Sequence, residues 1–184
     1  MRAVIVAALL LGIAMTVSGQ GSNAWPTDTA GTGGFSAKRL VVVPAIDGRQ
    51  WIEADVKVGG SAPWRPAKAD YTLRFTDIDE EGDLQRWALM VQRSGTRPVS
   101  LTTGGKTGFA YVTPDARFVF MEPLIVVDVR RWRRYALYSA LGIEPYVGIH
   151  AISRDGRRLL VSHSKCAFDC PNQPVTYFEL TLPS

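Results

Sequence analysis

Apolar and polar residues alternate along short segments of this chain, which is the pattern of β-strands with one buried face. Tyr71, Leu73 and Phe75 are large and apolar, for example, whereas the residue after each of them is polar. Glycine, proline and aspartate separate such segments, as they do at turns. The pattern predicts strands over residues 40–46, 51–58, 71–78, 84–92, 99–103, 108–113, 117–121, 124–129, 134–138, 147–153, 158–163 and 175–182.

Helical periodicity is weak along the whole chain. No window of about eleven residues keeps the spacing of an amphipathic helix, and the 11 prolines are spread along the sequence. Residues 137–141 could form one helical turn at most. The expected fold class is therefore all-β, an antiparallel meander of short strands joined by tight turns.

The first residues have the pattern of a secretory signal peptide. Arg2 is followed by an apolar run over residues 3–17, and Ser18 and Gly19 are the small residues of a cleavage site. A membrane anchor is the alternative, but a spanning helix needs about 20 apolar residues and this run is shorter. We therefore predict a signal peptide over residues 1–19, a periplasmic or secreted location, and no transmembrane anchor after cleavage.

The rest of the chain divides into two parts by composition. Residues 20–38 are rich in glycine, serine and threonine and poor in large apolar residues, so we expect a flexible leader there. Residues 39–184 carry the strand pattern and have the length of one ordinary domain. We expect a single β domain with propeller-like repeats over this second part.

Two segments match each other at an offset of about 40 positions, residues 108–120 and 148–160. Each reads as strand, polar turn and strand, and similar pairs of strands precede them. The first turn carries Asp115 and Arg117, and the second carries the run from Asp155 through Gly156 to Arg157. In such a turn the aspartate can accept backbone hydrogen bonds and glycine supplies a positive φ. A period of about 40 residues built from four strands is typical of a propeller blade.

These repeats resemble those of TolB-type, WD-like β-propellers, in which the turn reads Ser-Pro-Asp-Gly-Arg. This chain has Thr-Pro-Asp-Ala-Arg at 113–117 and Ser-Arg-Asp-Gly-Arg at 153–157, and the resemblance extends over residues 84–162. It implies a small propeller-like arrangement of four-stranded blades, with a β-sandwich as the alternative. It also implies a platform that binds a protein or a ligand, because this repeat specifies a fold more than a reaction.

The two cysteines, Cys166 and Cys170, are close together in a chain that we expect to be exported. A local disulfide that holds the surrounding loop is the favoured interpretation, because exported proteins fold in an oxidising compartment. A metal site is the sharper alternative. His163, Cys166 and Cys170 have a spacing that zinc ligands could use, with His150 as a fourth ligand.

An acidic run copies the opening of a calcium-binding loop. Asp77, Asp79 and Glu81 stand at its first alternate positions, but Ala88 occupies the twelfth position, where the bidentate glutamate belongs. The segments on both sides have strand patterns instead of helical ones. We therefore expect an acidic hairpin turn.

The densest basic cluster of the chain is a candidate binding surface. Its members are Arg130, Arg131, Trp132, Arg133, Arg134 and Tyr135. Guanidinium groups bind carboxylate and phosphate through paired hydrogen bonds, and aromatic faces stack, so the cluster could grip an anionic glycan or a phosphate. The alternative is an exposed hairpin whose charges are simply solvated.

Charge and missing motifs limit the function classes. Lys and Arg number 21 against 17 Asp and Glu, and a net charge of +4 is too small for a nucleic-acid binder. The chain has two histidines, His150 and His163, and no Gly-x-Ser-x-Gly or His-Glu-x-x-His motif.

We expect an exported, non-catalytic binding or scaffold module of the cell envelope, without a cofactor, whose partner is an envelope protein or an anionic glycan. The alternatives are an envelope hydrolase or metal-dependent enzyme using His150 and His163, and a structural interaction protein.

Overall fold

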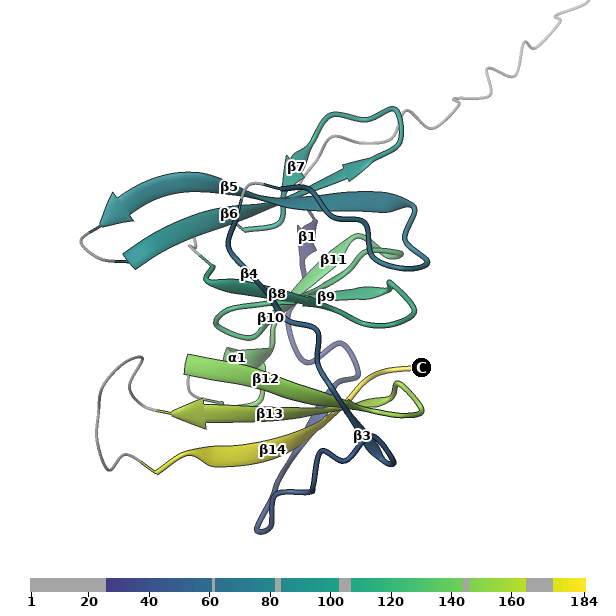
Figure 1. Ribbon diagram of the computed structural model, residues 1–184, viewed down its shortest axis with the longest axis vertical. Helices are drawn as coiled ribbons and strands as arrows, with labels where there is room; N and C mark the ends of the chain where they lie inside the picture. The colour runs from purple at the N-terminus through teal and green to yellow at the C-terminus, as the bar shows by residue number, and fades with distance from the viewer. Residues whose placement is uncertain (1–25, 61, 82–83, 103–106, 144–145, 165–173) are drawn as a thin grey trace, which may run out of the picture.

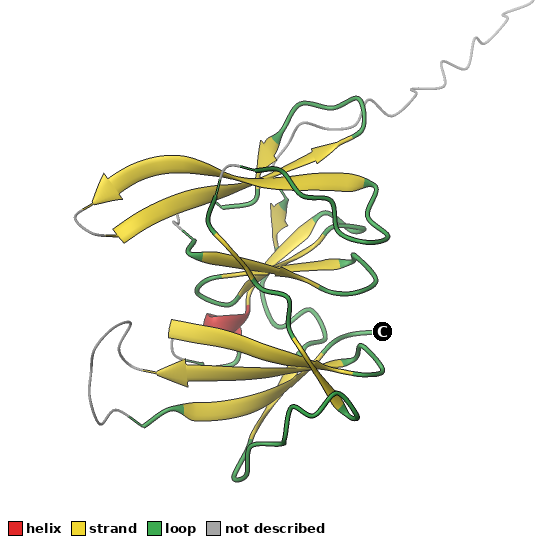
Figure 2. Cartoon of the chain, in the orientation of Figure 1, coloured by secondary structure: helices red, strands yellow, loops and turns green. Residues whose placement is uncertain are grey.

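The computed structural model describes residues 26–184 except 61, 82–83, 103–106, 144–145 and 165–173. Figure 1 shows three β-sheets stacked as layers in this part of the chain. Neighbouring strands are antiparallel apart from one short parallel pair. Figure 2 shows how little helix accompanies them. The predicted all-β class and the antiparallel pairing are confirmed.

The first layer is a three-stranded sheet in the order β5-β6-β7. Its strands are β5 (Tyr71–Glu81), β6 (Leu84–Arg93) and β7 (Val99–Ser100). The predicted alternation holds, because Tyr71, Leu73 and Phe75 are buried against the middle layer. The opposite face of this sheet carries threonine, arginine and glutamine and lies toward solvent.

The middle layer has six strands in the order β1-β11-β10-β9-β8-β4. They are β1 (Thr27–Asp28), β11 (Arg133–Ala136), β10 (Ile125–Asp128), β9 (Phe118–Met121), β8 (Phe109–Val112) and β4 (Lys57–Val58). Helix α1 (Leu137–Ala140) follows β11 and is the single helical turn that the sequence predicted.

The third layer has five strands in the order β2-β14-β13-β12-β3. They are β2 (Ser36–Arg39), β14 (Thr176–Thr181), β13 (Arg158–Ser164), β12 (Tyr146–Ser153) and β3 (Trp51–Glu53). A bulge interrupts the β12–β13 register between Ile149 and Ala151.

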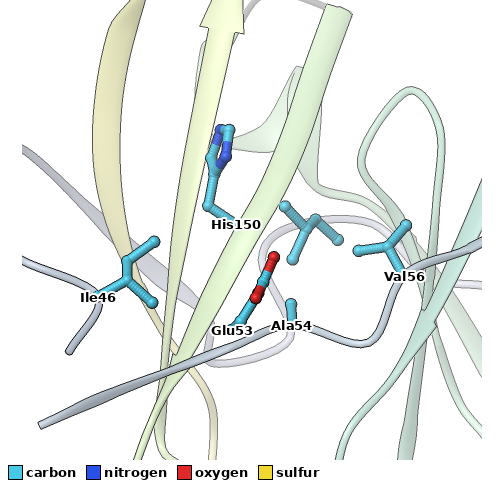
Figure 3. Close-up of a pocket in the computed structure, with 6 residues that line it drawn as sticks. Ile46, Glu53, Ala54, Val56 and His150 are labelled. Atoms are coloured by element: carbon cyan, nitrogen blue, oxygen red, sulfur yellow. The ribbon is translucent and has the colours of Figure 1, made fainter. Parts of the chain in front are cut away.

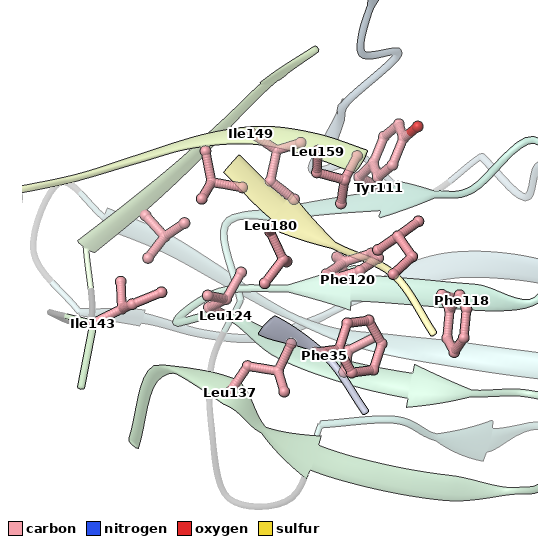
Figure 4. Packing of buried hydrophobic residues seen from close by; sticks show 14 of the residues in the cluster. Phe35, Tyr111, Phe118, Phe120, Leu124, Leu137, Ile143, Ile149, Leu159 and Leu180 are labelled. Carbon is pink, nitrogen blue, oxygen red and sulfur yellow. The ribbon is translucent and has the colours of Figure 1, made fainter. Parts of the chain in front are cut away.

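The central strands of the middle sheet, β8, β9 and β10, are buried on both faces, which explains why they do not alternate. All four residues of β9 are buried. Phe118 and Phe120 pack toward the third layer, as Figure 4 shows, whereas Val119 and Met121 pack toward the first. Each large apolar side chain buried in this way contributes about 1.5–3 kcal/mol to stability. The two interfaces between layers form the two main cores of the protein.

Two predicted strands at the start of the β domain are wrong. The strand expected at 40–46 is a loop, because β2 ends at Arg39 and Val41 is 100% exposed. A run of β-branched residues has strand propensity, but here no sheet edge lies beside it to supply partners. The strand expected at 51–58 is two strands, β3 in the third layer and β4 in the middle layer, and the chain crosses between layers after Ala54.

Residues 26–38 belong to the β structure, which corrects the expectation of a flexible leader for them. β1 pairs with β11, β2 pairs with β14, and Phe35 is buried between them. The ring of Phe35 meets the ring of Phe118 edge to face at 5.1 Å. One aromatic anchor and two short strands are enough to dock a segment whose composition reads as disordered. The predicted signal peptide lies outside the described residues.

Candidate functional site

The two repeat turns have the same hydrogen-bond network. In the first, Thr113 Oγ1 donates to Asp115 Oδ1 (2.7 Å), the Arg117 amide donates to the same oxygen (3.1 Å), and the Phe118 amide donates to Thr113 Oγ1 (3.0 Å). In the second, Ser153 Oγ donates to Asp155 Oδ1 (2.6 Å), which also accepts from the Arg157 amide (3.0 Å). The amide of Arg158 completes it by donating to Ser153 Oγ (2.9 Å).

Backbone geometry is also shared between the two turns. Ala116 has a φ of 57° and Gly156 a φ of 71°, both in the left-handed region. The predicted roles of the aspartate and of the positive φ in these turns are therefore observed. Asp155 has a lowered pKa because the Ser153 hydroxyl, and then the Arg157 amide, hydrogen-bond to its carboxylate.

Both turns lie at the same end of the stack, at the right of Figure 1, together with the β10–β11 turn and the loops that precede β5 and follow β6. We call this surface the turn end and define it as residues 65–70, 93–98, 113–117, 129–133 and 153–157. Hydrogen bonds join it across the layers. The Tyr71 hydroxyl donates to Ala116 O (2.9 Å), and Arg117 Nη1 donates to Pro183 O (3.3 Å).

Arg117 is a structural residue of the turn end. Its Nε lies 3.2 Å from Asp128 Oδ2, and the two side chains are only 11% and 2% exposed. Asp128 Oδ1 also accepts from the amides of Arg130 and Arg131, each at 3.1 Å. The carboxylate of Asp128 thus holds the β10–β11 turn and the repeat turn together. A buried ion pair of this kind leaves Arg117 little freedom to bind a ligand.

The basic cluster of residues 130–135 splits into structural and exposed members. Arg134 forms a bidentate salt bridge with Asp28, in which Nε donates to Oδ1 (2.6 Å) and Nη2 donates to Oδ2 (3.1 Å). Tyr135 is buried in the core. Arg130 donates to Asp115 O at 3.3 Å. Arg131 and Arg133 are exposed, and within the described part of the chain their guanidinium groups have no hydrogen-bond partner.

Trp132 of the same cluster is oriented by a residue that sequence reasoning missed. The guanidinium carbon of Arg93, at the end of β6, lies 4.7 Å from the centre of the Trp132 ring. Arg93 Nη2 also donates to Val129 O (2.5 Å). Arg93 is far from this cluster in sequence, so no local pattern could have indicated the contact. It ties the first layer to the basic turn of the middle layer.

A cleft of about 440 Å³ opens beside this contact, between the first and middle layers. Its lining residues are Lys68, Ala69, Asp70, Tyr71, Arg93, Asp115, Ala116, Val129 and Arg130. The lining is mostly polar and carries both signs of charge. Burial raises the pKa of Tyr71, with a further rise from Asp70, so its hydroxyl stays protonated as a donor.

A second depression, of about 560 Å³, lies beside β3 and β12 and includes Glu53 and His150 (Figure 3). His150 Nε2 lies 2.7 Å from Ser162 Oγ, and burial lowers the pKa of the imidazole below its ordinary value of 6.5. In Figure 3 the His150 ring points away from Glu53. Within the described chain this serine–histidine pair has no carboxylate to orient it, unlike a catalytic triad.

The two histidines lie on opposite faces of the third layer. His150 stands with Ser162 and Tyr177, whose ring centre is 5.5 Å away, on the outer face. The ring of His163 contacts Phe178 at 5.0 Å, and Phe178 packs toward the inner core. Because side chains alternate between faces along a strand, the two imidazoles cannot meet in one site. The structure therefore places the two histidines of this candidate site on separate faces of the sheet.

The remaining candidates are placed as follows. Cys166 and Cys170 lie outside the described residues, so the disulfide stays a prediction. The β5–β6 ladder continues to the Glu81–Leu84 pair, with a bulge between Asp77 and Asp79, so the acidic run is a hairpin as expected. Within the described ranges no three His, Cys, Asp or Glu side chains form a group that could hold a metal ion.

The fold and the turn end define the class of this protein as an all-β protein of three stacked sheets with a mixed-charge, arginine-rich rim. No family model, curated protein or solved structure matches the chain. None of the helical residues described here forms a segment long and apolar enough to cross a membrane.

Proposed function

We propose that this protein is an exported, non-catalytic binding module of the cell envelope and that its turn end binds an anionic glycan. The observation that carries the proposal is the set of exposed arginines there, which the turns of two different layers bring to one surface. They are Arg130, Arg131, Arg133, Arg154 and Arg157. Exposed guanidinium groups are planar, always charged and able to hold carboxylates through paired hydrogen bonds.

The charge of the turn end supports this assignment. Its residues include ten lysines and arginines and three aspartates. Such a local excess of positive charge steers a polyanion toward the rim at low ionic strength, although the net charge of the whole chain is modest.

The propeller-like arrangement remains part of the proposal. It is supported by the stacking of three meander sheets in chain order and by the equivalent turns of β8–β9 and β12–β13. A blade stack presents its turns along one rim, and rims of this kind serve as binding platforms. The predicted signal peptide supports the envelope location.

A serine hydrolase is the second candidate, and the 2.7 Å contact between His150 and Ser162 favours it. Ser162 is only 8% exposed, and both of its neighbouring strands are paired, so the local amides are used in the sheet. A serine-directed fluorophosphonate probe tests this function. Labelling that Ser162→Ala abolishes would establish it in place of the binding module.

Retention on an immobilised carboxylated polysaccharide such as alginate tests the binding proposal, with uncharged dextran as the reference matrix. We expect retention on alginate that weakens as salt rises, and loss of it in the double variant Arg131→Glu with Arg133→Glu. The matched control reverses two charges on β2, Lys38→Glu with Arg39→Glu, and should stay bound. Equal retention of both double variants would refute the proposal.

A further inference from the structure

We infer that the cleft between the first and middle layers binds the carboxylate and neighbouring hydroxyls of a single acidic sugar unit. The inference rests on the proposed function, because it names the part of the glycan that the turn end recognises. Three cations line the cleft, Lys68, Arg93 and Arg130, and two carboxylates, Asp70 and Asp115, lie among them. A volume of about 440 Å³ is within the range of small-ligand sites.

Arg93 is the cation of the cleft whose side chain is held in place by contacts on two sides. Its side chain is held from one side by the Trp132 ring and from another by Val129 O. Because the guanidinium is already oriented, it would bind a ligand oxygen with little further loss of freedom.

The two carboxylates decide what kind of anion fits. Asp115 already accepts hydrogen bonds from Thr113 and from the Arg117 amide through Oδ1, while its Oδ2 lies 3.8 Å from Arg130. Asp70 is exposed at the edge of the cleft. A ligand with several negative charges would be repelled by these groups. A ligand with one carboxylate and several hydroxyls offers donors to the aspartates and an acceptor to the cations.

Backbone strain at the cleft provides an independent observation. Lys68 has a φ of 93° in the turn closed by the Ala69 amide and Pro66 O, a position that glycine adopts at lower cost. Ala116, also in the lining, has a φ of 57°. Strained non-glycine residues cluster at functional sites. Two of the four non-glycine residues with positive φ in the described chain line this cleft.

The apolar content of the cleft favours a sugar over an acidic peptide. Its aliphatic lining consists of Ala69, Ala116 and Val129, and Tyr71 uses its hydroxyl on Ala116 O. Peptide recognition usually relies on a large apolar anchor in a pocket, and this lining offers none. A hydroxyl-rich ring matches the polar walls better.

Calorimetric titration of the full exported chain with methyl glucuronide tests the inference, with methyl glucoside, sodium sulfate and a short acidic peptide as comparison probes. We expect the glucuronide to bind at least tenfold more tightly than the other three. Lys68→Gly should weaken that binding about tenfold or more while the melting temperature stays equal or rises, because the strained position is relieved. Lys38→Gly is the control and should bind normally.

Three results would overturn the inference. They are equal binding of glucuronide and glucoside, tighter binding of the acidic peptide or of sulfate, and unchanged glucuronide affinity in Lys68→Gly. The alginate experiment separates this failure from failure of the proposed function. Retention that depends on Arg131 and Arg133, without glucuronide binding, would refute the cleft alone. Absence of retention would refute the binding function as a whole.

Discussion

The turns at 113–117 and 153–157 have the same hydrogen bonds and lie in different surroundings. Ala116 is 7% exposed and its carbonyl accepts the Tyr71 hydroxyl, whereas a methyl group built on Gly156 would meet nothing within 4 Å. The first turn is covered by the first layer, and the second stands at the open side of the stack. The same hydrogen-bond network can therefore occur in a turn that is packed between layers or in a turn at the surface.

The arginines that end the two turns show the functional consequence. Arg117 is paired with the buried Asp128 and lies 4.5 Å from the centre of the Phe118 ring. Arg157 uses its backbone in the turn and leaves its side chain exposed. The same residue of the repeat is thus structural in one copy and available for binding in the other. The predictions below test that difference, from the largest effect to the smallest.

Asp128→Ala should have the largest effect, because it leaves Arg117 without its partner in a buried position and removes the acceptor of two backbone amides. We expect a loss of about 3–5 kcal/mol in the free energy of unfolding, measured by urea denaturation. Arg157→Ala is the comparison and should change it by less than about 0.5 kcal/mol. Similar losses in both variants would contradict the distinction between the two arginines.

Thr113→Val and Ser153→Ala remove the hydroxyl that each turn network shares. Each should cost about 1–3 kcal/mol, because the aspartate and the following strand amide lose a partner. Thr113 and Ser153 are both buried, so the two losses should be similar although only the first turn is covered by another layer. Chemical denaturation of the two variants in parallel gives the comparison, and losses that differ by more than about 1 kcal/mol would contradict it.

Exchanging glycine and alanine at the positive-φ position of each turn should change the stability of the protein by different amounts. Gly156→Ala should lower stability by about 1 kcal/mol, because a Cβ is unfavourable in the left-handed region. Ala116→Gly should be nearly neutral, since the relief of strain is offset by loss of a buried methyl worth about 0.8 kcal/mol. Thermal unfolding measures both. A clear gain in Ala116→Gly would show that the methyl contributes little to the packed turn.

The smallest expected effect is the loss of stability in acid that comes from Asp155 in the turn at 153–157. The pKa of Asp155 lies below its ordinary value of 3.8, so its ionised form stabilises the folded state above that value, and this contribution is lost as the pH falls below it. Asp155→Asn should therefore show a smaller drop in melting temperature than the wild type between about pH 4.5 and pH 2.5. An identical drop would show that the hydrogen bonds to Asp155 do not persist in solution.

Much of the fold could be predicted from the alternation pattern, and the errors have physical causes. Most strands from Tyr71 onward were found, because each has either one buried face or a short apolar run between turn residues. The segment 40–46 was misassigned because strand propensity does not supply a neighbouring strand. Residues 26–38 were misassigned because composition cannot show that Phe35 would find Phe118 and Phe120.

The candidate site was predictable only in part. The basic cluster and the repeat turns stood out because charge density and the Asp-x-Arg spacing are local signals. Lys68, Asp70 and Arg93 carried no such signal, and they join the cleft through the packing of two layers. The sequence also suggested that His150 and His163 could act together, whereas sheet geometry separates them.

By itself, the sequence determined most of the strands and the turn chemistry, because these depend on neighbours along the chain and on composition. Only the tertiary structure decided which layer each strand joined, which arginine was buried against Asp128 and which remained exposed. The reason is that burial and ion pairing depend on residues far apart in sequence. The same Asp-x-Arg turn therefore acquires its role only when the layers are stacked.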